Sequence, residues 1–157
     1  MQVETTVNMD SWIKVRLCRA SEATGRSRSW IVVTVMKRLA KQSGTLFRDT
    51  GCVRYQAGGE RSAWRRTHLS LYGRDYDLFL DMKKLFRGSV SLLVAYAIER
   101  YLDTIVERVL NGEFNEDTDN YPFQCYVITH ETIDSAIVWK IYWGIPANPA
   151  RLLAPSP

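Results

Sequence analysis

Two short stretches of the sequence place arginine and serine side chains immediately before an apolar run. The residues are Arg26, Ser27, Arg28 and Ser29 before IVVTVM, and Arg87, Ser89 and Ser91 before LLVAYAI. If each apolar run is helical, its first backbone N–H groups have no intrahelical acceptor and carry a partial positive charge, which favours an anion. Arginine adds charge and serine adds a hydroxyl donor. Both stretches therefore predict a helix start that binds a phosphate, and a glycine before each, Gly25 or Gly88, permits the turn.

The same serines have a simpler explanation. Ser27 and Ser89 are suited to cap their own helices, and a serine cap stabilises a helix by about 1 kcal/mol. Capping and phosphate binding are compatible, because a capped helix start still carries its positive dipole end. Capping explains the serines but not the arginines, so the phosphate prediction depends on the arginines.

Two segments elsewhere alternate polar and apolar residues with a period of two. VETTVNM at residues 3–9 and RTHLSL at residues 66–71 show this pattern, which is typical of a half-buried strand. The polar side of the two segments comprises Glu4, Thr6 and Asn8 in the first, and Arg66, His68 and Ser70 in the second. The simplest interpretation of these six residues is the solvated face of a strand.

Helices are predicted between and after these strands. Residues 11–24, about 27–42, 74–86 and 89–110 carry apolar residues at helical spacing, and Gly25 and Gly88 are expected to end the first and third helices. The glycine-rich residues 43–64 are interpreted as a connection with one short strand at CVRYQ. After an acidic loop, FQCYVIT and SAIVWKIYW are predicted to form a hairpin that turns at HETID, before a proline-rich end.

Charge is distributed unevenly along the 157 residues. Residues 1–110 hold 19 basic and 11 acidic side chains, whereas residues 111–157 hold 2 and 6. A basic body favours a polyanionic partner such as nucleic acid. The apolar stretches are too short to cross a bilayer and MQVETTVNMD does not resemble a signal peptide, so we expect a cytoplasmic protein without membrane association.

The same order of elements occurs twice, at about residues 3–42 and 66–108: a strand, a helix, a glycine turn and a helix that begins Ser-x-Ser. This order resembles the ribbon-helix-helix family, which includes the methionine and Arc repressors. Met9 to Gly25 spans 16 residues and Leu71 to Gly88 spans 17, which predicts one extra residue in the second copy, near Tyr72 and Gly73. The resemblance implies that the two strands pair antiparallel into a ribbon that enters the major groove of DNA. It also implies that the second helices hold the DNA backbone with their starts.

Carried over to this chain, the resemblance makes the six polar strand residues the base-reading side chains. Asn8 is suited to adenine, Arg66 to guanine, and Thr6 or Ser70 to several base edges. Glu4 departs from the family's basic or amide character, and could only accept from cytosine or repel a phosphate. Because one chain carries both strands, we expect a monomeric pseudo-dimer, or a higher homo-oligomer on DNA, that reads a non-palindromic site.

Two other functions are alternatives to DNA binding. Asp75, Asp77 and Asp81 could suggest a metal nuclease, but the sequence has no matching histidine or carboxylate motif, and the histidines are isolated. We therefore expect neither catalysis nor a cofactor, nor a metal. A protein-interaction module, for example an antitoxin, is the stronger alternative, with a protein partner at the C-terminal hairpin. The aromatic residues of that hairpin are Tyr126, Trp139, Tyr142 and Trp143.

The predicted fold class is α+β and mainly helical. Two tandem ribbon-helix-helix units pair their strands into one antiparallel ribbon, and a β-hairpin follows. The expected organisation along the chain is a first unit at 1–42, a connection at 43–64, a second unit at 65–110, and a region at 111–157 that holds the acidic loop, hairpin and tail. The expected function is that of a transcriptional regulator, for example a repressor.

Overall fold

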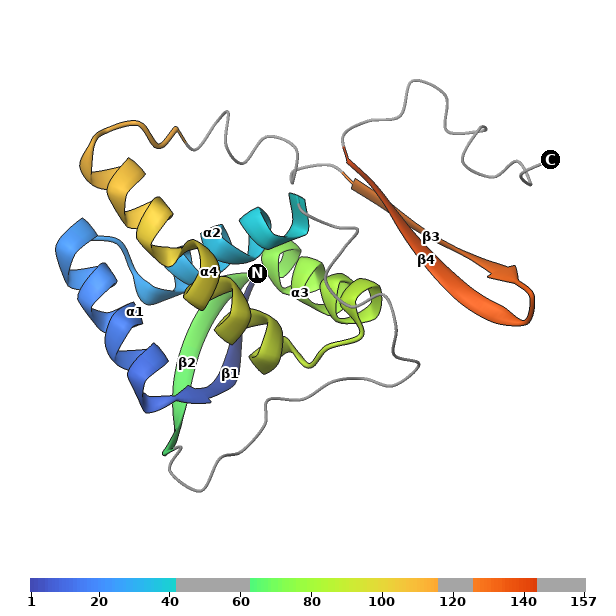
Figure 1. Ribbon diagram of the computed structural model, residues 1–157, viewed down its shortest axis with the longest axis horizontal. Coiled ribbons are helices and arrows are strands. Elements are labelled where there is room, and N and C mark those ends of the chain that lie inside the picture. Colours follow the sequence, from blue (N-terminus) through green and yellow to red (C-terminus); the bar gives the residue numbers. More distant parts are fainter. Residues whose placement is uncertain (42–62, 116–125, 144–157) are drawn as a thin grey trace. The chain divides into compact units, whose positions relative to one another are not determined.

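The computed structural model describes residues 1–41, 63–115 and 126–143. The chain divides into two compact units, Met1–Phe114 and Asn115–Pro157. The first contains two successive β-α-α repeats and the second contains a β-hairpin, so the fold class is α+β and mainly helical, as predicted (Figure 1). The strand predicted at CVRYQ and the proline-rich end lie outside the described residues.

The first repeat consists of strand β1 (Gln2–Asp10), helix α1 (Ser11–Thr24) and helix α2 (Arg28–Lys41). Asp10 ends the strand in an extended conformation, and its carboxylate accepts a hydrogen bond from the Trp12 backbone N–H (3.2 Å), which caps α1. Gly25 ends α1 with a φ of 66°, the left-handed conformation that glycine adopts without a steric penalty.

The second repeat consists of strand β2 (Trp64–Tyr72), helix α3 (Gly73–Phe86) and helix α4 (Val90–Leu110). Adding 62 to the bounds of β1 and α1 gives the bounds of β2 and α3, and adding 62 to the first residue of α2 gives the first residue of α4. The two repeats therefore have equal spacing throughout the strand, the first helix and the turn.

The extra residue predicted in the second repeat is absent, because α3 does not end at a glycine. Arg87 is the C-cap of α3 and adopts the left-handed conformation (φ 49°), at the position equivalent to Gly25. Gly88 follows it and is equivalent to Arg26. The prediction that Gly25 and Gly88 are equivalent is therefore wrong by one residue.

Strands β1 and β2 pair antiparallel over their whole length and form the only sheet of the repeats within the described residues. Their inner side chains, Val7, Met9, Leu69 and Leu71, are buried. The ends of the ribbon are closed by equivalent bonds: the Ser11 N–H donates to the Ala63 carbonyl (3.1 Å) and the Gly73 N–H donates to the Met1 carbonyl (3.2 Å).

Each second helix lies against the strand of the other repeat. Helix α4 contacts β1, helix α2 contacts β2, and the two helices pack on each other (Figure 1). Their buried side chains, including Ile31, Met36, Leu93 and Ile98, form one core with the inner face of the ribbon. The two repeats are therefore intertwined, and neither buries its apolar face without the other.

Hairpin strands β3 (Tyr126–Ile133) and β4 (Ala136–Trp143) pair antiparallel in the second unit. Asp134 and Ser135 form the turn and both have positive φ, of 48° and 67°, as a two-residue type I′ turn requires. The strands thus continue through the segment HETI, and the turn predicted at HETID is shorter and displaced toward the C-terminus.

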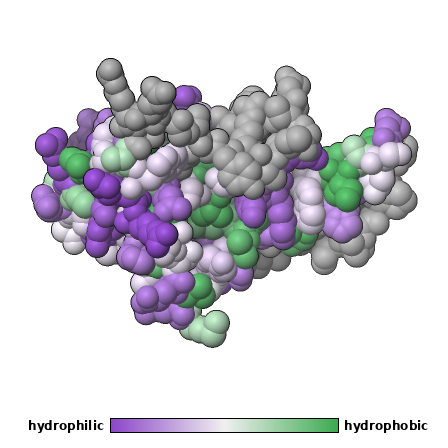
Figure 2. Space-filling model, turned by 90° about the horizontal axis from the view of Figure 1, so that it is seen from below, coloured by the Kyte–Doolittle hydropathy of each residue, from purple (hydrophilic) through white to green (hydrophobic). Residues whose placement is uncertain are grey.

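On the surface shown in Figure 2, hydrophilic residues are interspersed with small hydrophobic patches. Within the described ranges, no helix combines the length and the apolar character needed to cross a membrane.

Candidate nucleic-acid interface

The six polar strand residues lie together on one exposed face of the β1–β2 ribbon, which we call the outer face. They form three directly opposed pairs, Glu4 with Ser70, Thr6 with His68, and Asn8 with Arg66. All six are exposed, whereas Val7, Thr67 and Leu69 between them are buried. The alternation in the sequence predicted this arrangement, because successive side chains of a strand point to opposite faces.

The middle pair marks the centre of the outer face. Thr6 Oγ1 and His68 Nδ1 are joined by a hydrogen bond of 3.2 Å, and the two residues are 62 positions apart, so they are equivalent in the two repeats. The flanking pairs define two ends, which we call the Glu4–Ser70 end and the Asn8–Arg66 end. The outer face therefore has a backbone that is nearly two-fold symmetric about its centre.

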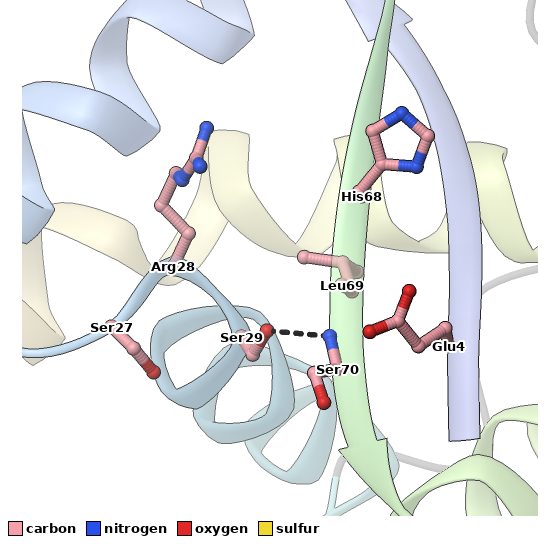
Figure 3. Close-up of a pocket in the computed structure, with 7 residues that line it drawn as sticks. All are labelled: Glu4, Ser27, Arg28, Ser29, His68, Leu69 and Ser70. Carbon is pink, nitrogen blue, oxygen red and sulfur yellow. Dashed lines mark hydrogen bonds between the residues drawn. The ribbon is translucent and has the colours of Figure 1, made fainter. Parts of the chain in front are cut away.

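The starts of α2 and α4 are fixed to the two edges of the ribbon by serine hydroxyls. Ser29 Oγ accepts a hydrogen bond from the Ser70 backbone N–H (3.0 Å), as Figure 3 shows. Ser91 Oγ accepts the equivalent bond from the Asn8 backbone N–H (3.2 Å). Helix α2 thus begins beside the Glu4–Ser70 end, and α4 begins beside the Asn8–Arg66 end.

The other two serines cap their own helices. Ser27 Oγ accepts from the Trp30 N–H (3.1 Å), and Ser89 Oγ accepts from the Leu92 N–H (3.1 Å). The capping explanation is therefore confirmed. Each of the four hydroxyls accepts a bond and retains a proton that it can donate, so an additional phosphate contact is chemically compatible with these roles.

The arginines at the helix starts have different surroundings. The guanidinium of Arg26 lies over the Trp30 ring (4.9 Å to its centroid), and that ring meets Phe114 edge-on at 5.1 Å. Arg28 is exposed at the first position of α2. Arg87 is half-buried at the C-cap of α3. Arg28 is therefore the arginine best placed to add charge beside the outer face.

A pocket of about 270 Å³ joins the start of α2 to the Glu4–Ser70 end. In Figure 3, Ser29 points toward β2 while the Arg28 side chain extends away from the helix, and Glu4 approaches from β1. The pocket is lined by Glu4, Ser27, Arg28, Ser29, His68, Leu69 and Ser70. The structure thus brings together three predicted phosphate-binding residues and three predicted base-reading residues.

The outer face is longer than the sequence pattern indicated. Gln2 opposes Tyr72 beyond the Glu4–Ser70 end, and Asp10 opposes Trp64 beyond the Asn8–Arg66 end. Tyr72 is 66% exposed and Trp64 is 38% exposed. Strand β2 in fact runs from Trp64 to Tyr72. The predicted connection at 43–64 therefore ends one residue too late, and the extra residue predicted near Tyr72 is not there.

Basic groups gather near the Asn8–Arg66 end. Arg65 and Arg66 are both exposed, and the Lys14 ammonium donates to the Arg66 carbonyl (3.0 Å). Arg65 was not predicted as a site residue, although its place next to Arg66 was visible in the sequence.

Two of the three acidic residues of α3 have basic partners. Asp75 pairs with Lys37 (3.2 Å) and Asp81 pairs with Lys84 (3.1 Å). In the described part of the chain, no group of three or more His, Cys, Asp or Glu side chains could hold a metal ion. His68 lies at the centre of the outer face, and His130 packs edge-on against Trp139 in the hairpin (5.1 Å).

Comparison of the chain with protein-family models, with curated proteins and with solved structures finds no match. The topology is consistent with a tandem ribbon-helix-helix arrangement, because each β-α-α repeat contributes one strand to an antiparallel ribbon.

Proposed function

We propose that the chain binds double-stranded DNA sequence-specifically, with the outer face of the ribbon in the major groove. The observation that supports this proposal is the arrangement of six exposed polar side chains in three cross-strand pairs, flanked on both edges by a helix start. A two-stranded ribbon fits the width of the major groove, where the base edges are distinguishable.

The two kinds of residue have separate roles in this proposal. Phosphate contacts at the starts of α2 and α4 set the position of the ribbon, and the side chains of the outer face select the bases. Backbone N–H groups, the serine hydroxyls and the arginines at residues 26, 28 and 87 supply the phosphate contacts. The excess of basic residues in positions 1–110 adds a long-range attraction to DNA.

The proposed role is transcriptional regulation by occupancy of a DNA site, without catalysis and without a cofactor. One chain supplies both strands of its ribbon, so a single chain is the expected binding unit.

Fluorescence anisotropy of a labelled duplex at two salt concentrations tests the proposal. Affinity should fall steeply as salt rises, because binding releases counterions from the phosphates. Arg28→Ala should weaken binding to all sequences and reduce the logarithmic salt slope by about 1. Arg66→Ala and Asn8→Ala should each reduce affinity for a selected site by about 1–3 kcal/mol. Asn8→Ala should leave binding to unrelated duplexes nearly unchanged, whereas Arg66→Ala should weaken it by a smaller amount because it removes a cation.

Lys83→Ala is a matched control, because Lys83 is an exposed cation of α3 that the proposal does not use. Equal losses of duplex affinity in Lys83→Ala and Arg28→Ala would indicate that only the net charge of the protein attracts it to DNA. An absence of duplex binding at low salt would refute the proposal, and the C-terminal hairpin would then be the surface to test for a protein partner.

A further inference from the structure

The backbone around the outer face is repeated faithfully. Three pairs of bonds are equivalent under the 62-residue offset: the ribbon closures of Ser11 and Gly73, the strand anchors of Ser91 and Ser29, and the caps of Ser27 and Ser89. Because these bonds are equivalent, the two halves of a DNA site would meet the same backbone arrangement at equivalent positions of the ribbon.

The side chains held in that backbone arrangement are not equivalent. Under the same offset, Glu4 corresponds to Arg66 and Asn8 corresponds to Ser70. The difference continues at the helix starts, where Arg28 corresponds to Val90. The two ends of the outer face therefore differ in charge as well as in hydrogen-bonding groups.

The Asn8–Arg66 end is suited to purines. A guanidinium donates two hydrogen bonds to O6 and N7 of guanine, and a side-chain amide bonds to N6 and N7 of adenine. Lys14, which donates to the Arg66 carbonyl, and exposed Arg65 add positive charge near this end, whereas the carboxylate of Asp10 beyond it caps α1.

The Glu4–Ser70 end has the opposite character. A carboxylate can only accept hydrogen bonds, and the major-groove group of cytosine is the N4 amino donor. Glu4 also lines the pocket in which the start of α2 faces solvent, together with Arg28. The carboxylate repels a phosphate there, and the arginine, which has no counterpart on α4, offsets that repulsion.

We infer that the ribbon reads an oriented, non-palindromic duplex site, with purines at the Asn8–Arg66 end and a cytosine at the Glu4–Ser70 end. This inference rests on the proposed function. In a palindrome, equivalent positions of the two ends meet identical base pairs in the same orientation, so a half-site matched to the side chains of one end is a poorer match to those of the other. Each chain therefore binds its site in a single orientation.

Selection of bound duplexes from a random library by the full chain provides the first test. The selected site is expected to have two different halves and to bind one chain, as measured by analytical ultracentrifugation. Arg66→Ala should relax the base preference in one half only, and Glu4→Gln should relax it in the other half only. Glu4→Gln should also raise affinity for unrelated duplexes, since it removes a negative charge from the interface.

Palindromes built from each half of the selected site provide the second test. Both should bind about tenfold more weakly than the original site, which corresponds to the loss of one good base contact. The double variant Glu4→Arg/Ser70→Asn gives the Glu4–Ser70 end the same side chains as the other end. This variant should prefer the palindrome made from the purine half over the original site.

The changed residues are exposed, so the variants should keep the circular dichroism spectrum and melting temperature of the parent. A palindromic selected site, equal affinity for the original and palindromic duplexes, or relaxation of the same half by both single variants would overturn the inference while leaving DNA binding intact. Failure to bind any duplex would overturn the inference together with the proposed function.

Discussion

The two repeats, β1-α1-α2 and β2-α3-α4, make equivalent hydrogen bonds at the ribbon ends and helix starts, but many of their other side chains differ. Several buried positions keep their apolar character and exchange size: Leu17 corresponds to Phe79, and Ala20 corresponds to Met82, all four of them buried. Others do not, because buried Ile13 corresponds to Asp75 and buried Leu78 corresponds to Arg16. Exposed positions exchange charge, as in Glu4 and Arg66. The repeats therefore share their hydrogen bonds at the ribbon ends and helix starts, whereas the side chains of the outer face and some core positions differ between them.

Removing the aromatic ring of Phe79 from the core should produce the largest change in stability. Phe79→Ala should lower the free energy of unfolding by about 3–5 kcal/mol, because Phe79 is fully buried. Leu17→Ala, at the equivalent position, should lower it by about 2–5 kcal/mol. Urea denaturation followed by circular dichroism measures both changes.

The intertwined core also predicts how these variants unfold. A change in either repeat should shift one shared transition of Met1–Phe114, since neither repeat has a core of its own. Leu80→Ala is the control on α3, and its effect should stay below about 1 kcal/mol because Leu80 is partly exposed. Two separate transitions, with only one moved by Phe79→Ala, would show that the repeats are independent.

The serine caps should be equally important in both repeats. Ser27→Ala and Ser89→Ala should each destabilise the fold by about 1 kcal/mol, because each removes a side-chain acceptor for a helix N–H. Ser89→Asp should retain most of the stability. Thermal melts of the three variants measure these effects, and a loss confined to one repeat would contradict the equivalence of the helix starts.

Substitutions at Gly25 and Arg87, the two residues with a left-handed backbone at the ends of α1 and α3, should change stability in opposite directions. Gly25→Ala should destabilise by about 1 kcal/mol through backbone strain alone, because nothing lies within 4 Å of the added Cβ. Arg87→Gly should stabilise by a similar amount, since it relieves the same conformation (φ 49°). Arg87→Ala keeps the backbone strain but removes the guanidinium. In the same thermal melts it therefore separates the effect of relieving the strain from the effect of losing the arginine side chain.

The strands and helices were predictable because their apolar residues follow simple periods. The pairing of β1 with β2 was predicted from the resemblance, and it placed all six residues of the outer face correctly. The offset of the repeats was missed because α3 ends at a non-glycine residue in the left-handed conformation. The spacing from Ser27 to Ser89 and from Ser29 to Ser91, which is 62 in both cases, was the available signal.

Tertiary hydrogen bonds were not predictable from local patterns. The serine at position 29 bonds to a strand N–H 41 residues away, and the serine at position 91 bonds to one 83 residues away. A Ser-x-Ser pattern at a helix start indicates capping, but it does not reveal that the second hydroxyl anchors the helix to the other repeat's strand. The sharing of one pocket by Glu4 and Arg28 likewise depends on that long-range docking.

The smallest expected effects come from two ion pairs that join the repeats without symmetric counterparts. Lys37 and Asp75 are each only 16% exposed in their side chains, whereas Asp103, the partner of Arg16, is 88% exposed. Asp75→Asn should therefore destabilise by about 1 kcal/mol, and Asp103→Asn by less than about 0.5 kcal/mol.

Asp75 also lies in the first turn of α3, where a negative charge interacts favourably with the helix dipole. A double-mutant cycle with Lys37→Met and Asp75→Asn separates the two effects, because the dipole contribution does not depend on the lysine. The coupling energy of Lys37 with Asp75 should exceed that of Arg16 with Asp103 and should be less sensitive to added salt, since the former pair is less solvated. Equal couplings, similarly screened by salt, would show that the burial of the Lys37–Asp75 pair has no energetic consequence.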